Sequence, residues 1–126
     1  MVREVKQEHM NTIKKIIKDT NGGLLSEIKN SKLWYYTIDE KPVAALGIKD
    51  DNVLNILCTS KDYRNRNAAK ELFEAVKTIL MARGLSTIKA NVKEDAAEYF
   101  LRLRFIQNGK SFKKDGENYI PMTYSM

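Results

Sequence analysis

The sequence predicts an α/β (α+β) fold on one mixed β-sheet, and three patterns support it. Three β-branched or aromatic runs joined by short polar turns predict an antiparallel meander, at residues 33–38, 43–48 and 53–59. A strand, a long amphipathic helix and a second strand follow one another over residues 53–92, which favours a right-handed parallel βαβ unit. An Asp115-Gly116 pair between two alternating runs, 105–112 and 118–125, predicts a final hairpin.

The other elements follow from hydrophobic spacing. Residues 2–5 alternate enough for a short first strand, and residues 86–92 form the strand after the long helix. Gly-rich residues 19–23 predict the end of the first helix, and Arg83-Gly84 predicts the end of the longest one. The predicted helices are residues 7–18, 24–29 and 69–80, and a short helix that starts near Asp95 and ends before the strand at Phe105. The chain order is therefore β-α-α-β-β-β-α-β-α-β-β.

Composition limits the kind of protein. With 126 residues and a mass of 14.5 kDa, the chain is long enough for the core of one domain, which we expect to span residues 1–126. No apolar run approaches the roughly 20 residues of a membrane span, and the N-terminus carries no apolar signal segment. The single cysteine, Cys58, cannot form an internal disulfide. We therefore expect a cytoplasmic protein without a membrane partner.

A net charge of +6 favours an anionic partner. Nucleic acid and a phosphate-rich cofactor both fit this charge. The basic residues are spread along the chain among 16 acidic ones, however, with no basic tail or repeat. Nucleic acid is therefore not favoured, and a helix-turn-helix protein is the weakest of the alternatives.

The turn between the third meander strand and the longest helix is polar and basic. It contains Arg64, Arg66 and Lys70. A strand that passes directly into a helix start presents unpaired backbone N–H groups and the positive end of the helix dipole at one point. Such a point suits a phosphate group.

The residues of this turn read Arg64-Asn65-Arg66-Asn67-Ala68-Ala69, which resembles the R/Q-x-x-G-x-G/A signature of the GCN5-related N-acetyltransferases (GNAT). Asn67 replaces a glycine of that signature, and Asn is among the few residues that tolerate a positive φ angle. The resemblance implies acetyl-coenzyme A as cofactor, with its pyrophosphate held by the backbone of residues 64–69.

A second resemblance lies downstream. Residues 96–105 resemble the family segment A-x-x-F-Y-x-x-L-G-F, a helix that closes over the cofactor thiol, so Phe100 is expected at the cofactor. Phe100 stands where the family often has a tyrosine that protonates the leaving thiolate, and Arg104 replaces the turn glycine. The neighbouring Tyr99, although turned by about 100° on a helix, is the candidate catalytic residue.

The resemblance extends over nearly the whole chain, since the order of elements also agrees. It implies a mixed sheet of six to seven strands with a central splayed parallel pair, flanked by about four helices. The pantetheine arm of the cofactor is then expected to pair with Leu57, Cys58 and Thr59. No metal ion is implied, and a homodimer is an expectation by analogy alone.

The implied reaction moves an acetyl group to a primary amine, on a small molecule or peptide, by direct attack. The family's base is usually a glutamate or an ordered water on the meander strands, but residues 43–48 and 53–59 contain no glutamate. Asp50, Asp51 and Asn55 are the nearest polar residues, and none is assigned as base. The alternative is a GNAT-fold module with impaired catalysis that binds protein or nucleic acid.

Overall fold

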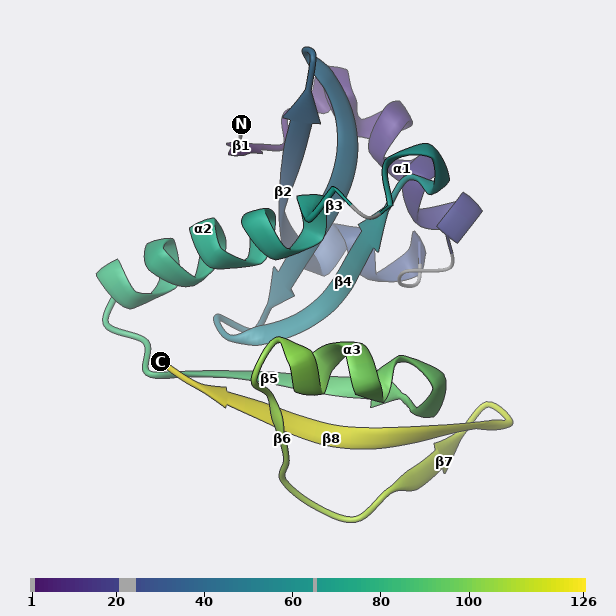
Figure 1. Cartoon of the computed structure of the whole chain (residues 1–126), viewed down its shortest axis with the longest axis vertical. Coiled ribbons are helices and arrows are strands. Elements are labelled where there is room, and N and C mark those ends of the chain that lie inside the picture. The colour runs from purple at the N-terminus through teal and green to yellow at the C-terminus, as the bar shows by residue number, and fades with distance from the viewer. Residues whose placement is uncertain (1, 21–24, 65) are drawn as a thin grey trace.

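The computed structural model describes residues 2–20, 25–64 and 66–126, which form a mixed eight-stranded sheet with three α-helices and four 3₁₀ helices (Figure 1). The strand order is β1-β2-β3-β4-β5-β8-β6, and β7 pairs with β8 beside this path. The strands are β1 (Val2–Glu4), β2 (Ser31–Ile38), β3 (Lys41–Lys49), β4 (Val53–Thr59), β5 (Thr87–Lys93), β6 (Ile106–Gln107), β7 (Phe112–Lys114) and β8 (Glu117–Ser125). The helices are η1 (Gln7–His9), α1 (Met10–Thr20), η2 (Leu25–Asn30), η3 (Lys61–Tyr63), α2 (Ala68–Ala82), η4 (Glu94–Ala96) and α3 (Ala97–Arg102).

The antiparallel meander of β2, β3 and β4 confirms the sequence prediction. Both of its turns place two consecutive residues at positive φ, first Asp39 and Glu40, then Asp50 and Asp51. Such turns match the right-handed twist of the flanking strands. The predicted helix at residues 24–29 is the 3₁₀ helix η2, and Leu24 and most of the predicted stop at 19–23 lie outside the described residues.

Two helices cover opposite faces of the N-terminal half of the sheet (Figure 1). On one face, Ile13, Ile16 and Ile17 of α1 pack against side chains of β2, β3 and β4. On the other face, α2 contributes Ala68, Leu72, Phe73, Val76 and Leu80 to a larger core that continues into β5 and β8. The apolar positions of both helices recur every three or four residues, as burial of one helical face requires.

The C-terminal half differs from the predicted hairpin in one respect. Residues 105–112 were expected as one strand, but regular pairing stops between β6 and β7, and both short strands pair with β8. At this interruption the Asn108 N–H donates to the Pro121 carbonyl over 2.8 Å, and Gly109 has a φ of 151°. This interruption divides one predicted strand into two, which gives eight strands where six to seven were expected.

The sheet is nearly divided between β4 and β5. These parallel strands are seven residues long each, yet their register contains only the pair Val53↔Lys89, and the Lys89 N–H donates to the Asn52 carbonyl over 2.9 Å. Towards their carboxyl ends the strands diverge. The splayed parallel pair that the family resemblance implied is therefore present.

A β-bulge in β4 accompanies the divergence. Gly47 pairs with Ile56 and Ile48 pairs with Leu54, so Asn55 is an extra residue without a partner in the register. The extra residue changes which face of the sheet the following side chains occupy. Leu54 packs in the core under α2, whereas Ile56, two residues later, packs in the core under α1. A bulge increases local twist and bends its strand. Here it bends β4 at the point where β5 is lost as a neighbour.

The side chain of Asn55 lies over Gly47 on β3. A Cβ atom at Gly47 would come within 3.0 Å of Asn55 Oδ1 and of Leu33 Cδ2, so only glycine leaves room for the amide. Asn55 Nδ2 donates to Ser31 Oγ over 2.7 Å. Its Oδ1 is buried and has no hydrogen-bond partner within the described residues. The bulge therefore places an incompletely bonded polar group beside the gap between the strands.

Candidate active site

The basic turn forms the start of α2. Arg64 is extended, with φ −66° and ψ 153°, and the N-cap residue Asn67 is left-handed, with φ 56° and ψ 22°. The tolerance of Asn for positive φ thus replaces the flexibility of the family's glycine. The Asn67 side chain makes no capping hydrogen bond. The first-turn N–H groups of α2 therefore face outward without a side-chain cap.

A groove of about 580 Å³ opens at this helix start, and we call it the loop groove. Three cations, Arg64, Lys70 and Arg102, contribute to its lining, and within the described residues no carboxylate does. Cations and a helix N-terminus act in the same direction on a bound anion. The lining residues are Leu57, Cys58, Thr59, Tyr63, Arg64, Asn67, Ala68, Ala69, Lys70, Tyr99 and Arg102.

Most residues predicted to bind the cofactor meet in this groove. They are Leu57, Cys58 and Thr59 from the end of β4, and Arg64, Asn67, Ala68 and Ala69 from the turn and helix. Cys58 also packs as a small apolar side chain under α1. Arg66 is not among the described lining residues, although its guanidinium carbon lies 5.5 Å from the centre of the Tyr63 ring, which does line the groove. Asn65 lies outside the described residues.

Sequence reasoning missed two residues of the loop groove, Tyr63 and Arg102. Tyr63 directly precedes Arg64, so its place in the basic turn was the available signal. Arg102 lies three residues after Tyr99 on α3, and residues three apart share one face of a helix. A helical projection from Tyr99 would have found it.

Helix α3 presents its two adjacent aromatic side chains to different grooves. Tyr99 lines the loop groove, and Phe100 lines a second groove between β4 and β5, as a step of about 100° on a helix predicts. Partial desolvation raises the pKa of the Tyr99 hydroxyl above its ordinary value, although the side chain is 37% exposed and the nearby Arg102 charge acts in the opposite direction. The phenol of Tyr99 is therefore protonated at neutral pH and able to donate.

Arg104 ends α3 in the conformation that the family's glycine would adopt. Its φ is 77°, its N–H donates to the Leu101 carbonyl over 2.9 Å, and the Phe105 N–H donates to the Phe100 carbonyl over 3.0 Å. This pair of bonds is a Schellman ending, which normally uses glycine because other residues are strained at positive φ. The sharp turn into Phe105 is thus preserved despite the substitution.

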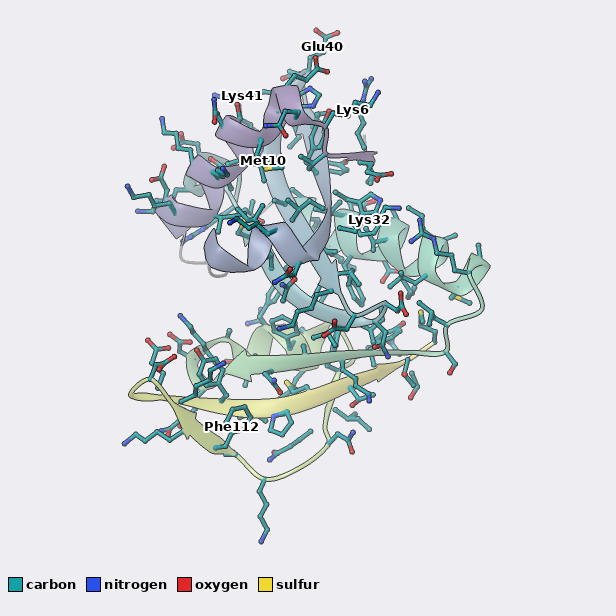
Figure 2. All side chains as sticks on the ribbon, turned by 180° about the vertical axis from the view of Figure 1, so that it is seen from behind. Lys6, Met10, Lys32, Glu40, Lys41 and Phe112 are labelled. Carbon is teal, nitrogen blue, oxygen red and sulfur yellow. The ribbon has the colours of Figure 1, made fainter. Side chains whose placement is uncertain are left out.

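The second groove, of about 260 Å³, occupies the gap between the diverging strands, and we call it the gap groove. It shares Leu57 with the loop groove, so the two meet at the end of β4. Phe112 lies on the β7–β8 part of the sheet (Figure 2). The lining residues are Lys49, Val53, Leu54, Asn55, Ile56, Leu57, Ala90, Asn91, Val92, Lys93, Ala96, Phe100, Phe112, Lys114, Asp115 and Tyr119.

Asp50, Asp51 and Asn55 are the polar residues nearest the expected position of the general base. Of these three, only Asn55 lines the gap groove. Asp50 and Asp51 form the turn before β4 and line a separate groove with Trp34 and Arg83. A seven-residue strand such as β4 spans about 20 Å, so its two ends are far apart. Asp50 and Asp51 are therefore turn residues rather than part of the candidate site.

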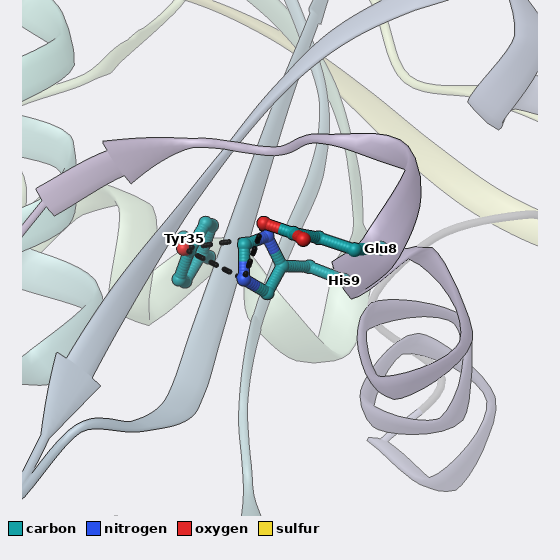
Figure 3. Close-up of polar contacts among 3 residues, drawn as sticks. All are labelled: Glu8, His9 and Tyr35. Atoms are coloured by element: carbon teal, nitrogen blue, oxygen red, sulfur yellow. Dashed lines mark hydrogen bonds and ion pairs between the residues drawn. The ribbon is translucent and has the colours of Figure 1, made fainter.

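The only histidine, His9, packs on Tyr35 away from both grooves (Figure 3). The ring centres are 4.9 Å apart, and the Tyr35 hydroxyl oxygen lies 3.4 Å from His9 Nε2. Glu8 Oε1 lies 3.7 Å from the same nitrogen, and 31% of the His9 side chain is exposed. His9 is therefore partly buried by Tyr35, and it lines neither groove.

Among the side chains that the structure describes, no three His, Cys, Asp or Glu residues gather closely enough to hold a metal ion. None of the helices described is both long enough and apolar enough to cross a membrane.

Comparisons with known proteins identify the family. A family model described as an acetyltransferase (GNAT) domain matches residues 1–126. No curated protein matched the chain.

Solved structures share the fold at low identity. The ribosomal-protein-S18-alanine N-acetyltransferase of Escherichia coli is 17% identical with a TM-score of 0.79, over 99% of this chain and 92% of that one. An aminoglycoside 6'-N-acetyltransferase in complex with coenzyme A is 11% identical with a TM-score of 0.81, over 99% and 96% of the two chains. An N-acetyltransferase of Staphylococcus aureus Mu50 is 13% identical with a TM-score of 0.75, over 99% and 97%. With a family match over its full length and this fold, the chain belongs to the GNAT acetyltransferase family.

Proposed function

We propose that residues 1–126 act as one domain that transfers the acetyl group of acetyl-coenzyme A to a primary amine of a small molecule or peptide. One observation carries the proposal. The loop groove, which is cationic and lies at the uncapped start of α2, adjoins the gap groove at one shared residue, Leu57. The cationic helix start suits a pyrophosphate. The gap in the sheet can admit a thioester from one side and an amine from the other.

The residues of the loop groove would hold the cofactor. The backbone N–H groups at the start of α2 point at the pyrophosphate position, and Arg64, Lys70 and Arg102 add positive charge around it. Residues 57–59 of β4 lie beyond the single pair with β5, so their backbone can pair with the amides of the pantetheine arm as a further strand would. Asn65 belongs to the same turn by sequence and keeps the role expected from the resemblance.

The chemistry is a direct attack. The amine nitrogen bonds to the acetyl carbonyl carbon, the carbon–sulfur bond breaks, the amine loses one proton and the thiolate gains one. Tyr99 is proposed to donate the proton to the thiolate, because its hydroxyl is protonated at neutral pH and lies in the groove that ends at Leu57. Asn55 is a neutral amide and cannot accept the amine proton, so the base is water in this proposal.

Isothermal titration with acetyl-coenzyme A tests the proposal. We expect saturable binding with one site per chain and a dissociation constant in the micromolar range, about −8 kcal/mol. A matched titration with desulfo-coenzyme A, which keeps the pyrophosphate and the arm, should give a similar affinity. Absence of binding up to millimolar acetyl-coenzyme A would remove the enzymatic function.

Substitution of Tyr99 by Phe tests its role as the acid. At pH 7 we expect turnover to fall by about 10-fold, because proton donation is lost while binding is kept. The pKa of the coenzyme A thiol is about 8.5, like that of cysteine, so a thiolate leaves readily without a proton above that pH. The deficit of Tyr99→Phe should therefore shrink between pH 7 and pH 9.5. A deficit that is constant across this range would contradict the role of Tyr99 as acid.

A module that binds without catalysis is the second candidate. It is favoured by Phe100, which has no proton to donate, and by the lack of a glutamate on β3 and β4. The two candidates separate when the cofactor-bound protein is offered a broad panel of amines and peptides. Release of free thiol with any of them supports the enzyme, and binding without release for the whole panel supports the module.

A further inference from the structure

The gap groove carries a chemical preference that the family alone does not assign. If the cofactor lies in the loop groove, as the proposed function requires, the gap groove is the place for an acceptor amine, because it adjoins the loop groove at Leu57. The side chains of the gap groove then decide which amines are accepted. Their charges and apolar surfaces point to one class.

Positive charge dominates the lining. Lys49 of β3, Lys93 of β5 and Lys114 of β7 line the groove, against Asp115 as the single carboxylate among its described lining residues. Outside the lining, Glu117 Oε2 lies 3.4 Å from Lys93 Nζ and offsets part of that charge. A polyamine or another polycation would meet repulsion here. A carboxylate near the Phe112–Tyr119 end of the groove would meet Lys93 and Lys114, whereas Lys49 pairs with Val53 at the other end.

A flat apolar wall stands beside these lysines. The rings of Phe112 and Tyr119 stack, with centres 5.6 Å apart and planes inclined by 18°. Phe112 remains 38% exposed although it is a large apolar side chain, and Phe100 adds a third ring to the lining. An exposed aromatic pair in a groove can bury a flat apolar group of a ligand. The volume of about 260 Å³ is below the roughly 300–1,000 Å³ of drug-sized sites, so the acceptor is small.

We therefore propose that the acceptor is a small amine that carries both a carboxylate and a flat apolar group, the chemistry of an aromatic amino acid. The lysines hold the carboxylate, and the Phe112–Tyr119 pair holds the apolar group. The amino nitrogen forms the bond to the acetyl carbon as the carbon–sulfur bond breaks. One amine proton passes to water, and the thiolate takes up one proton.

The test compares three acceptors by release of the coenzyme A thiol from acetyl-coenzyme A. L-Phenylalanine carries the carboxylate, L-phenylalaninamide has nearly the same shape without the charge, and spermidine is a polycation. The amide has the less basic amine, so its intrinsic reactivity at neutral pH is higher and the comparison is stringent. We expect kcat/KM for L-phenylalanine to exceed that for the amide by about 10-fold, as one charge-assisted hydrogen bond allows, and spermidine to be inert.

Two matched double variants test whether the preference for L-phenylalanine over its amide depends on the lysines of the gap groove. Lys93→Gln with Lys114→Gln removes two lysines of the gap groove, and Lys89→Gln with Lys113→Gln removes two lysines of the same strands that do not line it. We expect the preference for L-phenylalanine over its amide to disappear in the first double variant and to persist in the second. Both variants should bind acetyl-coenzyme A as the unchanged protein does.

The outcomes distinguish the acceptor class from the proposed function. If acetyl-coenzyme A binds but L-phenylalanine is not acetylated, or is used no better than its amide or spermidine, the acceptor class is overturned while the acetyltransferase function stands. A preference that both double variants lose equally would also overturn it, because net charge alone would then explain the effect. If acetyl-coenzyme A does not bind, both proposals are overturned.

Discussion

Ala69→Asp is expected to abolish the binding of acetyl-coenzyme A while leaving the fold intact. Ala69 lies in the first turn of α2 and lines the loop groove, so the new carboxylate would stand beside the proposed pyrophosphate. Two like charges about 4 Å apart repel by about 4 kcal/mol at an effective dielectric constant of 20. A loss of affinity of at least about 100-fold should follow in isothermal titration.

Ala69 is only 9% exposed, but it lines the loop groove, so the carboxylate can reach solvent there, and an acidic residue near a helix N-terminus is favourable. The fold should therefore survive. Ala69→Asn is the matched control, since it adds nearly the same bulk without the charge. We expect Ala69→Asn to retain a measurable affinity and both variants to keep the thermal unfolding temperature within a few degrees. Undiminished binding by Ala69→Asp would show that the pyrophosphate does not lie at the start of α2.

Phe105→Ala is expected to lower the free energy of unfolding more than any other substitution discussed here. Phe105 is 1% exposed, and its ring contacts Phe73 of α2, Phe100 of α3 and Tyr124 of β8, with centres 5.2–5.5 Å apart. Truncating a buried phenylalanine costs about 3–5 kcal/mol. For a chain of this length we expect the unfolding temperature to fall by about 10–20 °C in calorimetry.

Phe112→Ala makes the same chemical change at an exposed position and is the control. Phe112 keeps one stacked neighbour, Tyr119, so its loss should cost only about 1 kcal/mol. Equal destabilisation by the two substitutions would contradict the packing described here, because it would mean that Phe105 is no more buried than Phe112.

The sequence predicted the elements well where local rules determine them. The turns at Asp39-Glu40, Asp50-Asp51 and Asp115-Gly116 all adopt positive φ, and the helix end at Arg83-Gly84 has its glycine at φ 85°. Asn67 was compatible with positive φ and adopts it. These features depend on a few neighbouring residues, so a single sequence contains the information.

The bulge at Asn55 was not predictable in the same way. Residues 53–59 were predicted as one meander strand, and in a regular strand Leu54 and Ile56 would share one face. The structure places them in different cores because the register slips by one residue opposite Gly47. Register depends on contacts with a distant strand and on the space over one glycine, and neither is visible in the pattern of a single segment.

The part of the candidate site that is built from consecutive residues was predictable from the sequence. The end of β4 and the turn before α2 meet in the loop groove because they are consecutive, whereas Arg102 and the gap groove require α3, β5 and β7 to be placed in space. The side chain of Arg66 shows the limit in the other direction. Its position in the turn predicted a phosphate contact, which remains a prediction, but the turn gave no sign that its guanidinium would lie over the ring of Tyr63.

The single backbone pair between β4 and β5 has a consequence for how the protein responds to its cofactor. Without a ligand, the two halves of the sheet are joined at Val53 and Lys89 and by the side chains of α2. A pantetheine arm paired with residues 57–59 would extend the sheet at the end of β4, where only Leu57 also lines the gap groove. Occupancy should then make the two halves unfold more nearly as one unit, and the slowing of amide exchange should extend beyond the residues that the arm touches.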